Sequence, residues 1–260
     1  MTSVKKRDNM LPMVAAAGAT RPELGPITTS AGFTSLFVPT ARYLAPGVDQ
    51  GMSMRQRQTT FAVGYKERLQ IDVSGGGVWK WRRIVFAYKG GDSLWAGSFP
   101  GEWTEPFYSK AFKREPGDPT PLAPDMVRLI AQPTKDQAIA IRQLIWDGAE
   151  GVDWSSEFTA KIDTKRVRLL SDKTYTFNPG NESGISRTYN LWYPLRKNVV
   201  YDEPEYGGIS FGSGSPISVQ SKLGLGDVYV YDIVENTVQS KDKTGGLRFS
   251  PEGTYYWHER

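Results

Sequence analysis

The chain has 260 residues, a length that an all-β fold often reaches as one domain, and 12% of them are aromatic. This composition excludes a disordered chain, and the absence of Cys excludes disulfides, thiolate metal sites and a Cys nucleophile. The net charge of +4 is uneven: residues 1–100 carry 13 Lys and Arg against 6 Asp and Glu, and residues 201–260 carry 5 against 9. A basic N-terminal third fits a polyanionic partner, although chance scatter over the surface explains it equally well. We see neither a signal peptide nor an apolar run long enough to span a membrane.

Residues 1–58 precede the first regular pattern. Residues 1–14 contain the basic triplet Lys5, Lys6 and Arg7 and then an apolar run, and we expect them to lead into the first strand. Residues 15–58 are rich in Ala, Gly, Pro, Ser and Thr, which is typical of short strands and loops. We expect residues 15–260 to form a single domain.

Residues 59–73, TTFAVGYKERLQIDV, alternate between apolar and polar side chains as a half-buried strand does. The predicted apolar face holds Phe61, Val63, Tyr65, Leu69, Ile71 and Val73. The predicted polar face holds Lys66, Arg68, Gln70 and Asp72. Glu67 interrupts the apolar face, which indicates a bulge or a specific partner there. The turn SGGG and the β-forming run 78–89 follow, so we expect a hairpin.

One helix and several further strands complete the expected architecture. Residues 95–124 are rich in Pro, Gly and aromatics, as in a long surface excursion. Thr134 and Gln137 predict a capping box for a helix over 133–148 that Gly148 ends. Its expected buried stripe is Ala138, Ile141, Leu144 and Ile145. Later strands are expected at 157–163, 166–178, 186–195, 227–234 and 254–260. The fold class is therefore all-β, as a jelly roll or sandwich with one short helix.

Candidate catalytic groups are scarce. His258 is the only histidine and lies near the end of a predicted strand, where a structural role is expected. The glycine-rich stretches lack the Lys and Ser/Thr pattern of a phosphate-binding loop. Asp202, Glu203 and Glu205 form an acidic loop that we expect to be solvated. We therefore predict no catalytic residue, no metal site, no cofactor and no enzymatic activity.

The basic residues are the strongest functional signal. If the two strands pair as a hairpin, Lys66, Arg68, Lys80 and Arg82 gather on a small area, and Arg83 points to the other face. Like charges across a sheet repel one another, so an anionic partner such as a phosphate backbone is expected. Alternatively, carboxylates elsewhere in the fold pair with them. Trp79 and Trp81 share the face opposite Lys80, so we expect them to anchor a core or an interface.

Five blocks in chain order resemble the coat proteins of genomoviruses, small viruses with circular single-stranded DNA. They are KKRDNML, YKERLQI with VWKWRRIVFAYKG, WYPLRKNVVYDEPEYGG, KLGLGDVYVYDI and FSPEGTYYWHER, which together extend from about residue 4 to residue 260. The resemblance implies a single eight-stranded jelly roll with long loops. It also implies self-assembly of about sixty copies into a T=1 shell around the genome, or into a related arrangement such as the paired incomplete shells of geminiviruses.

The resemblance further implies contact between a basic inner surface and single-stranded DNA. The matching positions are Lys5, Lys6, Arg7, Lys66, Arg68, Lys80, Arg82 and Arg83. Residues 96–124 and 201–218 match subunit-contact and exterior segments, and the implied location is the virion, with assembly in the host nucleus. Family members usually begin with an arginine-rich arm, whereas only the short triplet is seen here. Either that arm lies outside this sequence, or packaging depends on the sheet cluster.

Two other functions remain open from the residues. One is a monomeric jelly-roll module that binds carbohydrate, with Trp95 and Trp103 stacking on sugars. The other is a single-stranded DNA-binding protein that forms no closed particle. Formation of a closed shell by the purified protein distinguishes a coat protein from both of these alternatives.

Overall fold

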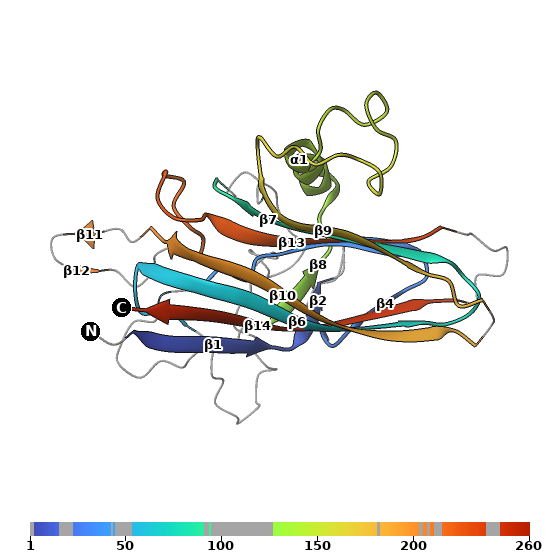
Figure 1. Ribbon diagram of the computed structural model, residues 1–260, viewed down its shortest axis with the longest axis horizontal. Helices are drawn as coiled ribbons and strands as arrows, with labels where there is room; N and C mark the ends of the chain where they lie inside the picture. The colour runs from blue at the N-terminus through green and yellow to red at the C-terminus, as the bar shows by residue number, and fades with distance from the viewer. Residues whose placement is uncertain are drawn as a thin grey trace.

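Two β-sheets pack face to face, and one helix lies against the outer side of the second sheet (Figure 1). The computed structural model describes residues 3–15, 23–42, 44, 54–90, 94, 127–180, 183–202, 205–206, 209–210, 215–237 and 245–260. Sheet A contains β1 (Val4–Met10), β14 (Leu247–Glu259), β6 (Thr59–Val73) and β10 (Ile185–Val200), in that order, with β4 (Ile27–Thr29) also paired to β14.

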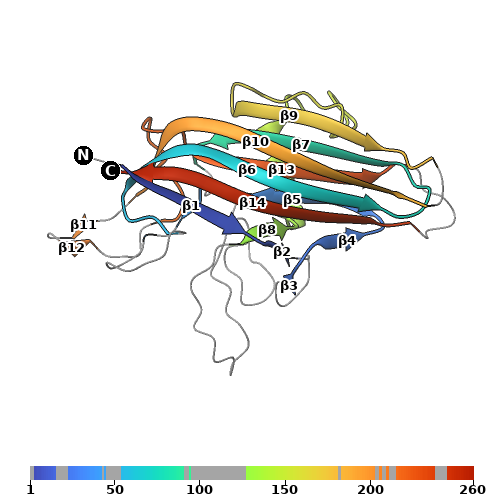
Figure 2. The same cartoon turned by 60° about the horizontal axis from the view of Figure 1, so that its bottom comes forward.

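Sheet B contains seven strands. Its order is β3 (Glu23–Leu24), β2 (Pro12–Ala15), β8 (Arg128–Ala131), β5 (Gly32–Phe37), β13 (Asp227–Asn236), β7 (Trp79–Tyr88) and β9 (Arg168–Phe177). A separate short ribbon pairs β11 (Glu205–Tyr206) with β12 (Ile209–Ser210). Figure 2 shows sheet A lying in front of sheet B, with both chain ends at one end of sheet A.

The eight longest strands follow the order of a jelly roll. In chain order they are β1, β5, β6, β7, β9, β10, β13 and β14. Counted from first to eighth, sheet A runs first, eighth, third, sixth, and sheet B runs second, seventh, fourth, fifth. All the pairs within these two runs are antiparallel. Two interlocked Greek keys give this order, which confirms the predicted all-β jelly roll.

The predicted hairpin between residues 59–73 and 78–89 is wrong. β6 pairs with β14 and β10 in sheet A, whereas β7 pairs with β13 and β9 in sheet B. The SGGG segment therefore carries the chain from one sheet to the other. Alternation along a strand reveals its buried face but not its hydrogen-bonded neighbours, so the sequence pattern fitted either arrangement.

A bulge reverses the predicted face of Phe61. Tyr256 faces Gly64 and Trp257 faces Ala62, which leaves Val63 as an extra residue of β6. A bulge shifts the alternation by one position, so Phe61 lies on the outer face with 40% of its surface exposed. Tyr65, Leu69, Ile71 and Val73 are buried, as predicted.

The predicted helix is confirmed as α1 (Lys135–Ile145), with the capping box formed by Thr134 and Gln137, but it ends at Ile145 with Trp146 as C-cap rather than at Gly148. Ile141 and Ile145 are buried, and Leu144 is half-buried against the core. Residues 157–163 form turns rather than the expected strand, apart from an isolated bridge at Ile162. None of the helical residues described forms a segment long and apolar enough to cross a membrane.

The central strands of sheet B are buried on both faces, whereas sheet A is buried on one. β13 is buried from Asp227 to Val234, as is nearly all of β7. The outer side of sheet B lies under α1 and the segment that follows it, where Trp146 packs 4.8 Å from the Arg82 guanidinium. In contrast, β6 and β14 alternate between buried and exposed residues. Of the described elements, none covers the outer face of sheet A.

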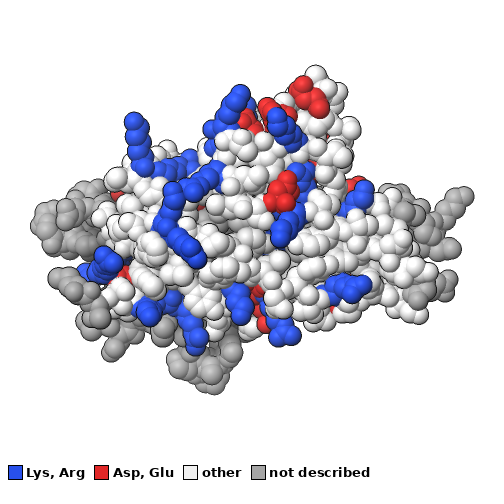
Figure 3. Space-filling view, in the orientation of Figure 1, with Lys and Arg blue, Asp and Glu red and all other residues white. Residues whose placement is uncertain are grey.

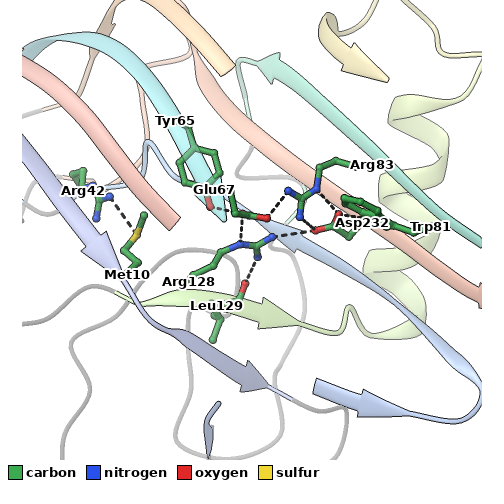
Figure 4. Close-up of polar contacts among 9 residues, drawn as sticks. All are labelled: Met10, Arg42, Tyr65, Glu67, Trp81, Arg83, Arg128, Leu129 and Asp232. Carbon is green, nitrogen blue, oxygen red and sulfur yellow. Dashed lines mark hydrogen bonds and ion pairs between the residues drawn. The ribbon is translucent and has the colours of Figure 1, made fainter. Parts of the chain in front are cut away.

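A network of four charged residues joins the sheets in the interior (Figure 4). Glu67 of β6 pairs with Arg83 of β7 and, at 3.0 Å, with Arg128 of β8. Asp232 of β13 binds both arginines, at 2.6 Å from Arg83 Nε and 3.0 Å from Arg128 Nη2, and accepts a hydrogen bond from Trp81 Nε1. All four side chains are buried, and their formal charges cancel. Glu67, which interrupts the apolar face in the sequence, therefore has specific partners.

Replacing Glu67 should destabilise the protein strongly. Glu67→Gln leaves two buried guanidinium groups with one carboxylate, so we expect the free energy of unfolding to fall by about 3–5 kcal/mol. The exposed Glu252 of β14 provides a matched control, and Glu252→Gln should change stability by no more than about 0.5 kcal/mol. Urea denaturation measures both variants; equal, small effects would show that the network is not needed for stability.

Lowering the pH should reduce the difference in free energy of unfolding between the wild-type protein and Glu67→Gln. Burial alone would raise the pKa of Glu67, but Arg83 and Arg128 outweigh it and lower that pKa from 4.5 to about 2. Between these values the unfolded chain binds the proton first, so stability falls as pH falls from about 4.5 towards 2. The Gln variant lacks this contribution, so the gap should shrink by about 3 kcal/mol between pH 5 and pH 2. If the difference in free energy of unfolding between the two proteins stays constant with pH, the lowered pKa of Glu67 is contradicted.

Candidate nucleic-acid interface

Lys66 and Arg68 lie on the outer face of sheet A because Glu67 between them is fixed inside. Successive side chains of a strand point to opposite faces, so an inward Glu67 places both neighbours in solvent. Both are exposed, whereas Tyr65, Glu67 and Leu69 are buried. The predicted polar face of this strand is therefore correct for these two cations.

β1 brings two more cations to the same face. It pairs with β14 along its whole length, from Val4 opposite Glu259 to Met10 opposite Gly253. Lys5 and Arg7 are exposed, and only β14 separates them from β6. Neighbouring strands are about 4.8 Å apart, so β1 and β6 lie roughly 10 Å from each other. We call Lys5, Arg7, Lys66 and Arg68 the basic face.

The four cations of the basic face form no ion pair with any described residue. Glu252 of β14 stands opposite Arg68 in the register, yet the two do not come within ion-pair distance. A shallow pocket of about 250 Å³ opens here, lined by Asn9, Met10, Leu11, Lys66, Arg68, Glu252, Gly253 and Thr254. In Figure 3, Lys and Arg outnumber Asp and Glu over the lower part of the molecule, where sheet A lies. Among the described residues, cations therefore outnumber carboxylates on this surface.

The other predicted cations do not reach this face, which corrects the predicted cluster. Lys6 points inward and is buried, 3.4 Å from Glu259, while its Nζ donates to the Met54 carbonyl at 2.8 Å. Arg83 belongs to the interior network. Arg82 lies on the outer side of sheet B, where Asp172 binds it at 2.7 Å and the Ala160 carbonyl accepts from it at 3.0 Å. Lys80 is half-buried on the same side, 6.0 Å from the ring of Phe158.

The exposed tryptophan of this face is Trp192 of β10 rather than either of the tryptophans in β7. Trp79 and Trp81 are fully buried, which confirms them as core anchors. Trp192 of β10 is 48% exposed and lies opposite Lys66 in the register. Sequence reasoning missed it, although its neighbours at the same alternation, Thr188 and Asn190, are polar. This polar alternation in the sequence indicates that Trp192 shares an exposed face with Thr188 and Asn190.

The remaining candidates contribute no further site. His258 is half-buried on β14 beside Phe61, with ring centres 6.2 Å apart. Trp95 and Trp103, proposed to stack on sugars, lie outside the described residues, as do Glu203 and all of 96–124. Among the residues that are described, no cluster of three metal-ligating side chains occurs.

Comparison with known proteins does not identify the chain. No protein-family model matches it, and no curated protein matches it. Among solved structures, a chain from "Structure of infectious bursal disease virus Gt strain" aligns at 11% identity over 98% of this chain and 70% of that one, with a TM-score of 0.13. A TM-score this low carries no argument, so the fold and the site depend on strand order and side-chain placement.

The basic face should determine the salt dependence of binding to single-stranded DNA. Each phosphate contact contributes about −0.7 to the slope of log K against log salt concentration. Lys66→Gln with Arg68→Gln should therefore make that slope shallower by about 1.4. The matched control removes Lys161 and Lys165 from the loop after α1, both exposed and on the other side of the molecule. Titrations with a labelled oligonucleotide measure both slopes; similar changes in the two variants would count against the basic face.

Proposed function

We propose that this chain is a viral coat protein whose copies assemble into a closed shell around single-stranded DNA. One observation carries the proposal: a jelly roll leaves one broad sheet face uncovered by described elements, and that face carries four cations that form no ion pair with a described residue. Viral capsid domains are among the proteins that use the jelly-roll architecture, although a fold alone does not determine function. The resemblance to genomovirus coat proteins supports the same function.

The chemistry of the basic face suits a contact that ignores base sequence. Lys and Arg side chains release counterions when they approach phosphates, and this gain is the same for any sequence. A protein that encloses a whole genome needs contacts of this kind rather than base-specific ones. In the proposed shell, sheet A faces inward, and Lys5, Arg7, Lys66 and Arg68 contact the DNA backbone.

Self-assembly requires further surface outside sheet A. Several large apolar side chains are well exposed in loops and at sheet edges, including Val152 at 83% and Leu223 at 65%. In the proposed shell, some of these side chains contact neighbouring copies. By the resemblance, about sixty copies would form a T=1 shell with closed symmetry. In this proposal the protein has no catalytic role and is located in the virion, with assembly in the host nucleus.

Particle formation tests the proposal directly. Purified protein at high concentration, with and without circular single-stranded DNA, should give uniform closed particles by negative-stain electron microscopy and a matching mass by light scattering. DNA recovered from these particles should be protected from nuclease. A strictly monomeric protein at physiological salt would contradict shell formation. Monomers that still bind DNA with a steep salt dependence would instead identify a free single-stranded DNA-binding protein.

A further inference from the structure

The Trp192 side chain lies across sheet A on the outer face. It starts on β10, passes over Gly64 of β6 and reaches Tyr256 of β14, where the two ring centres are 5.9 Å apart at an interplanar angle of 67°. An edge-to-face contact of this kind holds an aromatic ring in place. Nearly half of the Trp192 surface nevertheless remains exposed. A large, positioned ring is thus available to a ligand.

Gly64 makes room for this ring. A Cβ atom at position 64 would lie 2.4 Å from Trp192 Cη2 and 2.9 Å from the Tyr193 carbonyl oxygen, which is closer than real Cβ contacts. Any side chain at this position would therefore push the ring away from the sheet. The glycine is needed here for close packing, as in other strands where a group approaches the backbone closely.

Positive charge lies directly beside the ring. Trp192 and Lys66 are register partners, so their Cβ atoms are about 5 Å apart, and Arg68 follows two residues along β6. The two cations form no ion pair with a described residue. An aromatic ring followed along the strand by two cations that pair with no described residue matches a base and the phosphates of neighbouring nucleotides.

We infer that Trp192 stacks on an unpaired base of single-stranded DNA whose phosphates contact Lys66 and Arg68. The inference rests on the proposed function and adds selectivity to it: bases in a duplex are stacked on one another, so the ring contacts them only in a single strand. A second copy of this face is disfavoured as occupant, because it would bring eight like charges together.

Three probes of equal length separate stacking from charge. They are an oligothymidine of about 20 nucleotides, an abasic strand with the same phosphates, and a duplex. Fluorescence anisotropy with wild-type protein should show the oligothymidine bound about 5- to 100-fold more tightly than the abasic strand. Trp192→Leu should bring this ratio close to one without changing the affinity for the abasic strand. Trp192→Phe should restore part of the ratio.

Control variants keep the test decisive. Lys66→Gln with Arg68→Gln should weaken binding of both single strands while preserving their ratio, and Ile139→Ala on the distant helix should change neither. If Trp192→Leu fails to fold, Gly64→Ser provides a second way to displace the ring. Equal binding of oligothymidine and abasic strand by wild-type protein would overturn the stacking inference and leave the basic face intact. Failure to bind any probe and to form particles would overturn the proposed function itself.

Discussion

Glu67 and Asp232 share the guanidinium groups of Arg83 and Arg128 in the space between the two sheets. An unpaired charge in this space would cost several kcal/mol, so none of the four residues can turn outward alone. The network therefore fixes the facing of β6 and β7. An inward Glu67 sends Lys66 and Arg68 to solvent, and an inward Arg83 sends Arg82 beneath α1. One interior contact thus decides which cations a ligand can reach.

Local patterns in the sequence predicted the elements well, because burial on one face imposes alternation and a helix needs its cap. Thr134, Gln137 and the apolar residues from Tyr65 to Val73 all follow this logic. The pairing of β6 with β10 and β14 could not be predicted, since partners distant in sequence leave no local trace. A contrast in sequence pattern between β6 and β7 did indicate which of them is buried on both faces. The second half of β7, residues 84–88, is a continuous apolar run, as strands buried on both faces are, whereas β6 alternates.

Only part of the candidate site could be predicted from the sequence. Charge alone does not distinguish an exposed arginine from one that neutralises a buried carboxylate, so Lys66 and Arg83 looked alike in the sequence. Trp192 was missed because tryptophan is usually read as core. Its exposure depends on Gly64 in another strand and on Tyr256 in a third, a combination that exists only once the sheet has formed.

The pairing of β14 with both β1 and β6 has a consequence for the order of folding. β14 is a central strand of sheet A, yet it consists of residues 247–259. During synthesis, β1 and β6 therefore cannot be joined in one sheet until these residues leave the ribosome. Contacts between such distant segments form slowly. The arrangement that brings Lys5 and Arg7 of β1 beside Lys66 and Arg68 of β6 therefore exists only once β14 has paired with both strands.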